Sequence, residues 1–188
     1  MGKRQFEQIL GMHCAPTFIG LKAASLVSFP KKSFSNFDDF FSQYESCFRC
    51  KRISTFQLAE TDAYVLVLFY RAAALKQLLR RSDARKLLLD VGYPPHGSLA
   101  DLMHCLKERV RKAQGFPHEI GLFLGYPPTD VRGFIEHKGH NFLCCGYWKV
   151  YGDEGTAQAL FDLYANCTKD FCRKLQEGTP MEKLLQAV

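Results

Sequence analysis

The stretch from Ile53 to Tyr70, ISTFQLAETDAYVLVLFY, holds two apolar segments separated by the polar turn Glu60-Thr61-Asp62. This pattern predicts a β-hairpin with strands over 53–58 and 63–70. The second segment is rich in β-branched and aromatic residues at both odd and even positions, so both of its faces are expected to be buried. We therefore expect 63–70 to form a central strand of a sheet.

Outward from this hairpin, helical patterns dominate the chain. Toward the N-terminus we expect a short helix over 4–11, a second helix from Pro16, a strand over 24–29, and a helix over 35–48 capped by Ser35. Toward the C-terminus the expected helices cover 72–81, 82–90, 98–113, 117–124, 128–138 and 154–176, with a strand over 141–151 and a final turn from 179.

This order of elements predicts an α/β or α+β protein. A small, largely antiparallel or mixed sheet of about four strands is expected to be covered by several helices. The 188 residues contain no repeat and no long linker, so we expect a single domain over 1–188.

The chain carries no sign of export or membrane insertion. Glu7, Gln8 and His13 interrupt the apolar segment that a secretory signal needs after its basic start. The longest apolar run, 63–70, is much shorter than the ~20 residues that span a bilayer. We therefore expect a cytoplasmic protein, in which the 8 cysteines are reduced thiols and form no disulfide framework.

The net charge of +6 is concentrated in residues 71–115, which hold ten Lys or Arg and four Asp or Glu. Such a basic region can attract nucleic acid. However, Lys76 and Arg80 are four residues apart, as are Arg81 and Arg85, which is typical of a solvated helix face. No nucleic-acid motif accompanies these residues, so a nucleic-acid partner is the least favoured interpretation.

Three segments carry a resemblance to a known family. They are HCAPT at 13–17 with Gly20 and Lys22, FPHEIG at 116–121 running into Gly125-Tyr126-Pro127, and GYWKVYG at 146–152. The chain resembles the DUF3793 family, a bacterial family of unknown function, over nearly its whole length. The resemblance therefore implies a family but no activity, cofactor or site residue.

The first of these segments is a candidate site. His13, Cys14 and Thr17 surround the expected helix start at Pro16, and free N–H groups there bind anions and lower the pKa of a nearby thiol. Lys22 would add a positive charge if it folds back. The alternative is a capped helix start with a small buried thiol.

The second segment places His118 and Glu119 at the head of an expected helix. They are candidates for an acid–base pair, although neighbouring helical residues point about 100° apart. The alternative is structural, with Glu119 stabilising the helix N-terminus and His118 bonding to backbone. Leu122 occupies the position at which a zinc protease would have its second histidine.

The third segment and Tyr126 bring rings and an ammonium group near turns. If Tyr147, Lys149 and Tyr151 share one strand face, Trp148 and Val150 occupy the other. One face then packs on helices, and the other can offer rings and a cation to a flat or anionic ligand. Packing alone is the alternative.

A metal site has little support in the sequence. Cys47 and Cys50 have the spacing of a redox or zinc motif, but they end an expected helix where a redox motif would begin one. His137, His140 and Cys144 would have to complete a zinc site, and their spacing matches no standard pattern. Cys144 and Cys145 would point to opposite faces of a strand. No metal is therefore expected.

Two hypotheses of function follow. The first is a binding or accessory protein whose small molecule or protein partner is recognised near Cys14 and within 117–152. The second is an enzyme of redox or group-transfer chemistry that uses Cys14 or His118 with Lys149. The sequence identifies no cofactor and no specific partner, and it contains no P-loop or dinucleotide fingerprint.

Overall fold

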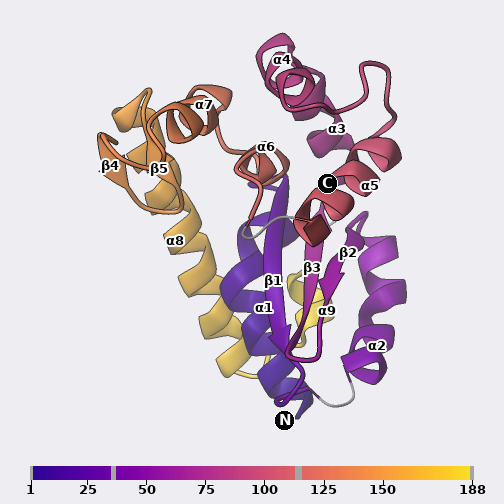
Figure 1. Ribbon diagram of the computed structural model, residues 1–188. Coiled ribbons are helices and arrows are strands. Elements are labelled where there is room, and N and C mark those ends of the chain that lie inside the picture. Colours follow the sequence, from indigo (N-terminus) through magenta and orange to yellow (C-terminus); the bar gives the residue numbers. More distant parts are fainter. Residues whose placement is uncertain (1, 35–36, 113–115, 187–188) are drawn as a thin grey trace. The chain divides into compact units, whose positions relative to one another are not determined.

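The computed structural model describes residues 2–34, 37–112 and 116–186. In chain order the elements are α1 (Lys3–Phe18), β1 (Ala24–Pro30), α2 (Phe37–Cys50), β2 (Ser54–Glu60), β3 (Tyr64–Tyr70), α3 (Ala72–Arg80), α4 (Ser82–Asp90), α5 (Leu99–Lys112), α6 (Ile120–Phe123), α7 (Pro128–Glu136), β4 (Cys144–Cys145), β5 (Lys149–Val150), α8 (Glu154–Gln176) and α9 (Met181–Leu184) (Figure 1). This confirms the expected α+β class.

The chain divides into two compact units. One comprises Met1–Ala72 and Tyr164–Val188, and the other comprises Ala73–Leu163. The expectation of a single domain stays a prediction. None of the described helices is both long and apolar enough to cross a membrane.

The first unit is built on an antiparallel sheet with the strand order β1-β3-β2 (Figure 1). β3 is central and pairs with β1 from Tyr70 opposite Ala24 to Tyr64 opposite Pro30. Every residue from Val65 to Phe69 is buried. The prediction from the 53–70 stretch is thereby confirmed, because a strand with apolar side chains on both faces is stable only between two neighbouring strands and under cover on both sides.

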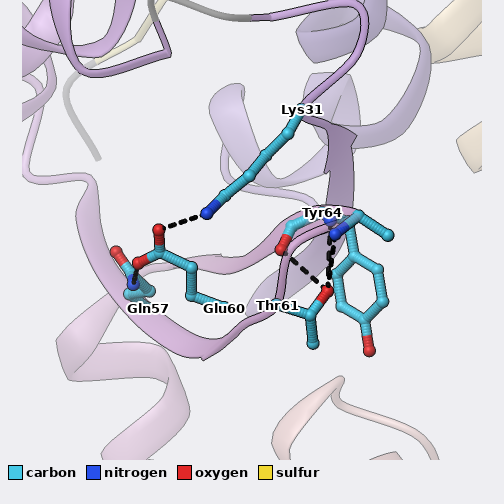
Figure 2. Close-up of polar contacts among 6 residues, drawn as sticks. Lys31, Gln57, Glu60, Thr61 and Tyr64 are labelled. Carbon is cyan, nitrogen blue, oxygen red and sulfur yellow. Dashed lines mark hydrogen bonds and ion pairs between the residues drawn. The ribbon is translucent and has the colours of Figure 1, made fainter.

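Polar contacts fix the hairpin turn between β2 and β3 (Figure 2). The Thr61 hydroxyl accepts hydrogen bonds from the backbone N–H groups of Ala63 and Tyr64, both at 3.2 Å. Glu60 accepts hydrogen bonds from Lys31 at 2.6 Å and from Gln57 at 2.8 Å. These two side chains hold the pKa of the Glu60 carboxyl below its usual range. The turn therefore has a local hydrogen-bond system of its own and a link to the end of β1.

Helices α1, α2, α9 and the end of α8 supply the helical part of the first unit's core, whose aromatic rings pack in stacked and edge-to-face pairs. Phe6 stacks on Phe29 with ring centroids 5.4 Å apart, and Phe18 meets the edge of Phe69 at 5.9 Å. A Cβ at Gly11 would lie 2.9 Å from Leu175 Cδ1, so α1 and α8 approach closely at this position.

Helix α1 differs from the expectation. The predicted break between 11 and Pro16 is wrong, since α1 runs without interruption from Lys3 to Phe18 with Pro16 inside it. Phe6, Leu10, Cys14 and Phe18 follow one another at four-residue spacing and are all fully buried. Burial of this stripe offsets the hydrogen bond that the proline nitrogen cannot donate. The helix ends at Phe18, and Gly20, two residues later, takes the left-handed conformation with a φ of +86°.

The helix predicted over 35–48 corresponds to α2, whose first described residue is Phe37. The proposed cap, Ser35, lies outside the described residues. The bounds of α4, in the second unit, and of the long helix α8, which has residues in both units, agree with the prediction. Ser98 begins α5 through a reciprocal pair: its N–H donates to Asp101 Oδ2 at 2.8 Å, and its hydroxyl accepts from the Asp101 N–H at 3.2 Å.

The strand predicted over 141–151 is wrong. Two short strands, β4 and β5, form a hairpin instead, with Cys145 opposite Lys149 and Cys144 opposite Val150. Gly146 N–H donates to the Trp148 carbonyl at 3.0 Å and closes the turn between them. A Cβ at Gly146 would lie 2.4 Å from the Phe161 ring, so glycine is required where this turn packs on the start of α8.

Candidate ligand-binding site

The candidate residues of the first unit lie in and just after α1. His13 is exposed, whereas Cys14 is fully buried in the middle of the helix. The predicted helix start at Cys14 is therefore corrected: the backbone N–H groups there belong to an uninterrupted helix and form no anion pocket. Burial raises the pKa of the Cys14 thiol far above its ordinary value, although the charge of Lys22 acts in the opposite direction.

Lys22 and Thr17 complete this group. Burial lowers the pKa of Lys22 to about 8, although the charge of Cys14 acts in the opposite direction. The Lys22 ammonium lies 6.0 Å from the centroid of the Tyr164 ring. The hydroxyls of Thr17 and Ser25 are 2.8 Å apart and both are buried. The first contact ties the segment after α1 to α8 and the second ties α1 to β1, so both have a structural role.

Five of the seven candidates of the second unit line one cavity of about 330 Å³. It is formed by the segment before α6, by α6, α7 and the β4–β5 hairpin, all within 116–149. Its lining residues are Phe116, Pro117, His118, Ile120, Gly121, Tyr126, Asp130, Val131, Phe134, Cys145, Gly146, Tyr147, Trp148 and Lys149. We call it the ring-walled cavity.

Aromatic contacts hold the walls of this cavity. Tyr126 stacks on Trp148 with ring centroids 4.9 Å apart, and Trp148 meets Phe161 edge to face at 4.6 Å. His118 packs on the edge of Phe134 at 5.0 Å. A Cβ at Gly121 would lie 2.8 Å from Val131 and 3.0 Å from Tyr126, so a side chain there would push these walls apart. The walls are thus fixed by packing among themselves.

Asp130 anchors the wall that contains Trp148. Its side chain is buried, and Oδ2 accepts the indole N–H of Trp148 at 2.7 Å. Oδ1 accepts the backbone N–H groups of Tyr151 and Gly152, each at 2.8 Å. Sequence reasoning missed this residue. An acid in the first turn of a helix after Pro127-Pro128 looks like an ordinary helix-stabilising charge, and only the fold shows its partners.

Lys149 and His118 are the polar candidates that the cavity brings together. Lys149 Nζ donates to the Gly139 carbonyl at 2.7 Å and lies 4.9 Å from the centroid of Phe142 and 5.8 Å from that of Phe134. His118 is exposed at the wall. Rings, a cation and an imidazole therefore surround the same space, which suits a flat ligand with a negative group.

Glu119 does not line this cavity. Its carboxylate is buried, forms an ion pair with Arg109 and accepts a hydrogen bond from the Tyr93 hydroxyl at 3.3 Å. Burial and the charge of Glu119 raise the pKa of Tyr93, so the phenol stays a donor. This arrangement gives Glu119 a structural role as the ion-pair partner of Arg109, and not as a stabiliser of the start of α6, where its side chain makes no capping hydrogen bond.

The remaining candidates also divide into residues that line the cavity and residues that do not. Tyr126, Tyr147 and Trp148 line the cavity, whereas Tyr151 packs on Gly133 and stacks on His137 at 5.6 Å. Because His13 and Cys14 belong to the first unit, their convergence with His118 and Lys149 stays a prediction. The described residues contain no group of three or more His, Cys, Asp or Glu side chains placed to hold a metal ion.

The model of a family described as "Protein of unknown function (DUF3793)" matches residues 10–185 of the chain. No curated protein and no solved structure matches the chain.

Proposed function

The chain belongs to the DUF3793 family, and we propose that it is a cytoplasmic binding or accessory protein that holds a flat, negatively charged small molecule in the ring-walled cavity. The observation that carries this proposal is the cavity itself. Its walls are mainly apolar and aromatic, and its few polar groups include the Lys149 ammonium and the His118 imidazole. This is the usual composition of a small-molecule site.

Exposed apolar side chains at the cavity support the same proposal. Phe116 is 51% exposed and Tyr147 is 41% exposed, and both line the cavity. Apolar surface next to a cavity contributes to binding when a ligand covers it. A cytoplasmic location is supported by the cysteines, since all eight are free thiols, as is usual in a reducing compartment.

Trp148 makes the proposal directly testable. It is the only tryptophan of the chain and lines the cavity, so its fluorescence reports on this site alone. Anilinonaphthalene sulfonate, an aromatic anion, is a suitable probe. We expect saturable binding with quenching of Trp148 and energy transfer to the probe. A probe that binds without changing the Trp148 emission would contradict the proposal.

Matched variants locate the probe. Cys145 is an exposed cavity residue, and a phenylalanine there fills space without disturbing the core. We expect Cys145→Phe to weaken binding about tenfold or more, a loss of ~1.4 kcal/mol. The matched control is Cys50→Phe, which alters an exposed thiol of the other unit and should leave the affinity unchanged. Lys149→Gln removes the ammonium group from the cavity and tests the preference for a negatively charged ligand. Lys86→Gln, which removes the same charge from an exposed position, is its control.

The alternative function is an enzyme that uses His118 with Lys149, which line the same cavity. A catalytic Cys14 finds no support, because a buried thiol of raised pKa is a poor nucleophile. Native mass spectrometry of protein purified without oxygen separates the two hypotheses. A retained flavin or nucleotide would favour the enzyme, whereas the mass of the bare chain favours the binding protein.

A further inference from the structure

The second unit contains a cavity of different character. It has a volume of about 220 Å³ and lies among α3, α4 and the beginning of α5. It shares no lining residue with the ring-walled cavity. Its lining residues are Lys76, Leu79, Arg80, Arg85, His96, Gly97, Ser98, Leu99 and Leu102. We call it the basic cavity, because none of these residues is acidic and three of them are Lys or Arg.

The three cations of the basic cavity have no acidic partner among the described residues. Lys76, Arg80 and Arg85 take part in none of the ion pairs found in 2–34, 37–112 and 116–186. Two other arginines in the basic part of the sequence are paired: Arg81 binds Asp83 at 2.9 Å, and Arg111 binds Glu108 at 2.7 Å. The cavity therefore gathers positive charges that are not neutralised by carboxylates.

Asp101, which lies in sequence between the lining residues Leu99 and Leu102, is already engaged. Asp101 Oδ2 accepts hydrogen bonds from the Ser98 N–H at 2.8 Å and the Ser98 hydroxyl at 2.7 Å. These bonds hold the pKa of Asp101 below its usual range. The carboxylate is thus committed to the start of α5 and does not line the cavity.

We propose that the basic cavity binds the phosphate or diphosphate group of a small phosphorylated molecule. Two guanidinium groups and one ammonium group provide donors for several phosphate oxygens, and guanidinium groups can bind them in a bidentate manner. Leu79, Leu99 and Leu102 form an apolar part of the wall, which raises the strength of charge interactions inside. The volume suits a phosphate group rather than a whole nucleotide.

A small phosphate compound is favoured over nucleic acid by the same residues. Single-stranded nucleic acid is bound by an extended basic groove with aromatic side chains on which bases stack. The basic cavity is a confined space, and its lining contains no Phe, Tyr or Trp. The three cations line this one cavity.

Calorimetric titration of the full chain with sodium pyrophosphate at low salt tests the proposal. We expect saturable binding that Lys76→Gln weakens about tenfold, the effect of losing one charge-assisted hydrogen bond. The matched control is Lys86→Gln, which removes the same charge from an exposed position of α4 outside the cavity. We expect this control to change the affinity less than about twofold, because exposed charges at a distance are screened.

Arg85→Gln provides a second variant from another helix, with the same expected loss. Because Lys76 is exposed, its replacement leaves the fold intact even if the half-buried Arg85 proves structural. Absence of saturable binding to the wild type would overturn the proposal. Equal losses in Lys76→Gln and Lys86→Gln would overturn it as well, since they would indicate attraction to the net charge. Binding of a single-stranded oligonucleotide that both variants weaken equally would also indicate attraction to the net charge and would overturn the proposal.

Discussion

The indole N–H of Trp148 donates a hydrogen bond to Oδ2 of Asp130 at 2.7 Å, across 18 residues of sequence and inside the second unit. Both side chains are buried. The other oxygen of Asp130 accepts two backbone N–H groups just after β5. One carboxylate thus fixes the aromatic wall of the ring-walled cavity and the course of the chain into α8.

Replacing Asp130 should therefore destabilise the second unit. Asp130→Ala leaves a buried indole N–H and two backbone N–H groups without their acceptor, at a cost of about 3 kcal/mol or more. Urea unfolding followed by Trp148 fluorescence measures the loss. Asp162→Asn is the control, because Asp162 is exposed and its carboxylate accepts a hydrogen bond from the Gln158 side chain at 3.1 Å. Equal midpoints for Asp130→Ala and the wild type would show that the carboxylate is dispensable.

A pair of glycines tests the close packing at the hairpin turn. Gly146→Ala would place a Cβ 2.4 Å from the Phe161 ring, whereas the nearest atom to a Cβ at Gly155 is 3.6 Å away. We expect Gly146→Ala to cost roughly 1–3 kcal/mol through overpacking. Gly155→Ala should be neutral or stabilise by up to ~1 kcal/mol, because it lies in α8. Thermal unfolding compares the two, and the opposite ranking would refute the packing argument.

Arg71 has a structural role in the first unit that its charge does not suggest. Its guanidinium is buried and donates to the carbonyls of Thr17, Phe18, Lys51 and Gln186. Burial lowers its pKa. A lysine ammonium cannot reach four carbonyls that surround a planar fork, so Arg71→Lys should cost about 2–4 kcal/mol. Arg49→Lys, at an exposed ion pair, should have almost no effect. Circular dichroism during urea unfolding measures both.

Cysteine reactivity should follow burial. The pKa of Cys14 is raised by burial, and the thiol is inaccessible. We expect iodoacetamide at neutral pH to modify the exposed thiols of Cys50 and Cys145 first and Cys14 last. Peptide mapping by mass spectrometry gives the order, and labelling in denaturant provides the reference. If Cys14 reacted first in the native protein, the hypothesis of a catalytic thiol would be restored.

The lowered pKa of Lys22 predicts that the stability of the protein depends on pH. Its pKa is lowered to about 8 in the folded state, chiefly by burial, and is about 10.4 in an unfolded chain. Between these values the unfolded state binds more protons, so this residue makes the free energy of unfolding rise with pH. Below about pH 8 the destabilisation by the buried charge is fully present.

The difference between wild type and Lys22→Met isolates this contribution from the other titrating groups. The wild type should gain stability relative to the variant from about pH 8 to about pH 10. Lys32→Met, at an exposed lysine, should show a constant difference from the wild type over the same range. Urea titrations at each pH measure the change. A constant difference for Lys22→Met would mean that the ammonium is solvated in the folded state.

Several features of this protein were determined by local sequence. The 53–70 hairpin, the central position of β3 and the bounds of α4 and α8 were predicted correctly, because alternation, helical spacing and turn residues act within a few positions. The ring-and-cation segment at 146–152 was also identified as a candidate site. Residues 146–149 of it line the ring-walled cavity together with 116–118, whereas Tyr151 does not.

Tertiary structure decided the rest. Pro16 was expected to start a helix, yet α1 continues through it because a buried stripe from Phe6 to Phe18 packs into the core. Trp148 was expected within a strand, yet Asp130, a distant residue, holds it beside a tight turn. Local patterns specify how a segment tends to fold, whereas burial and long-range hydrogen bonds arise only when distant segments meet.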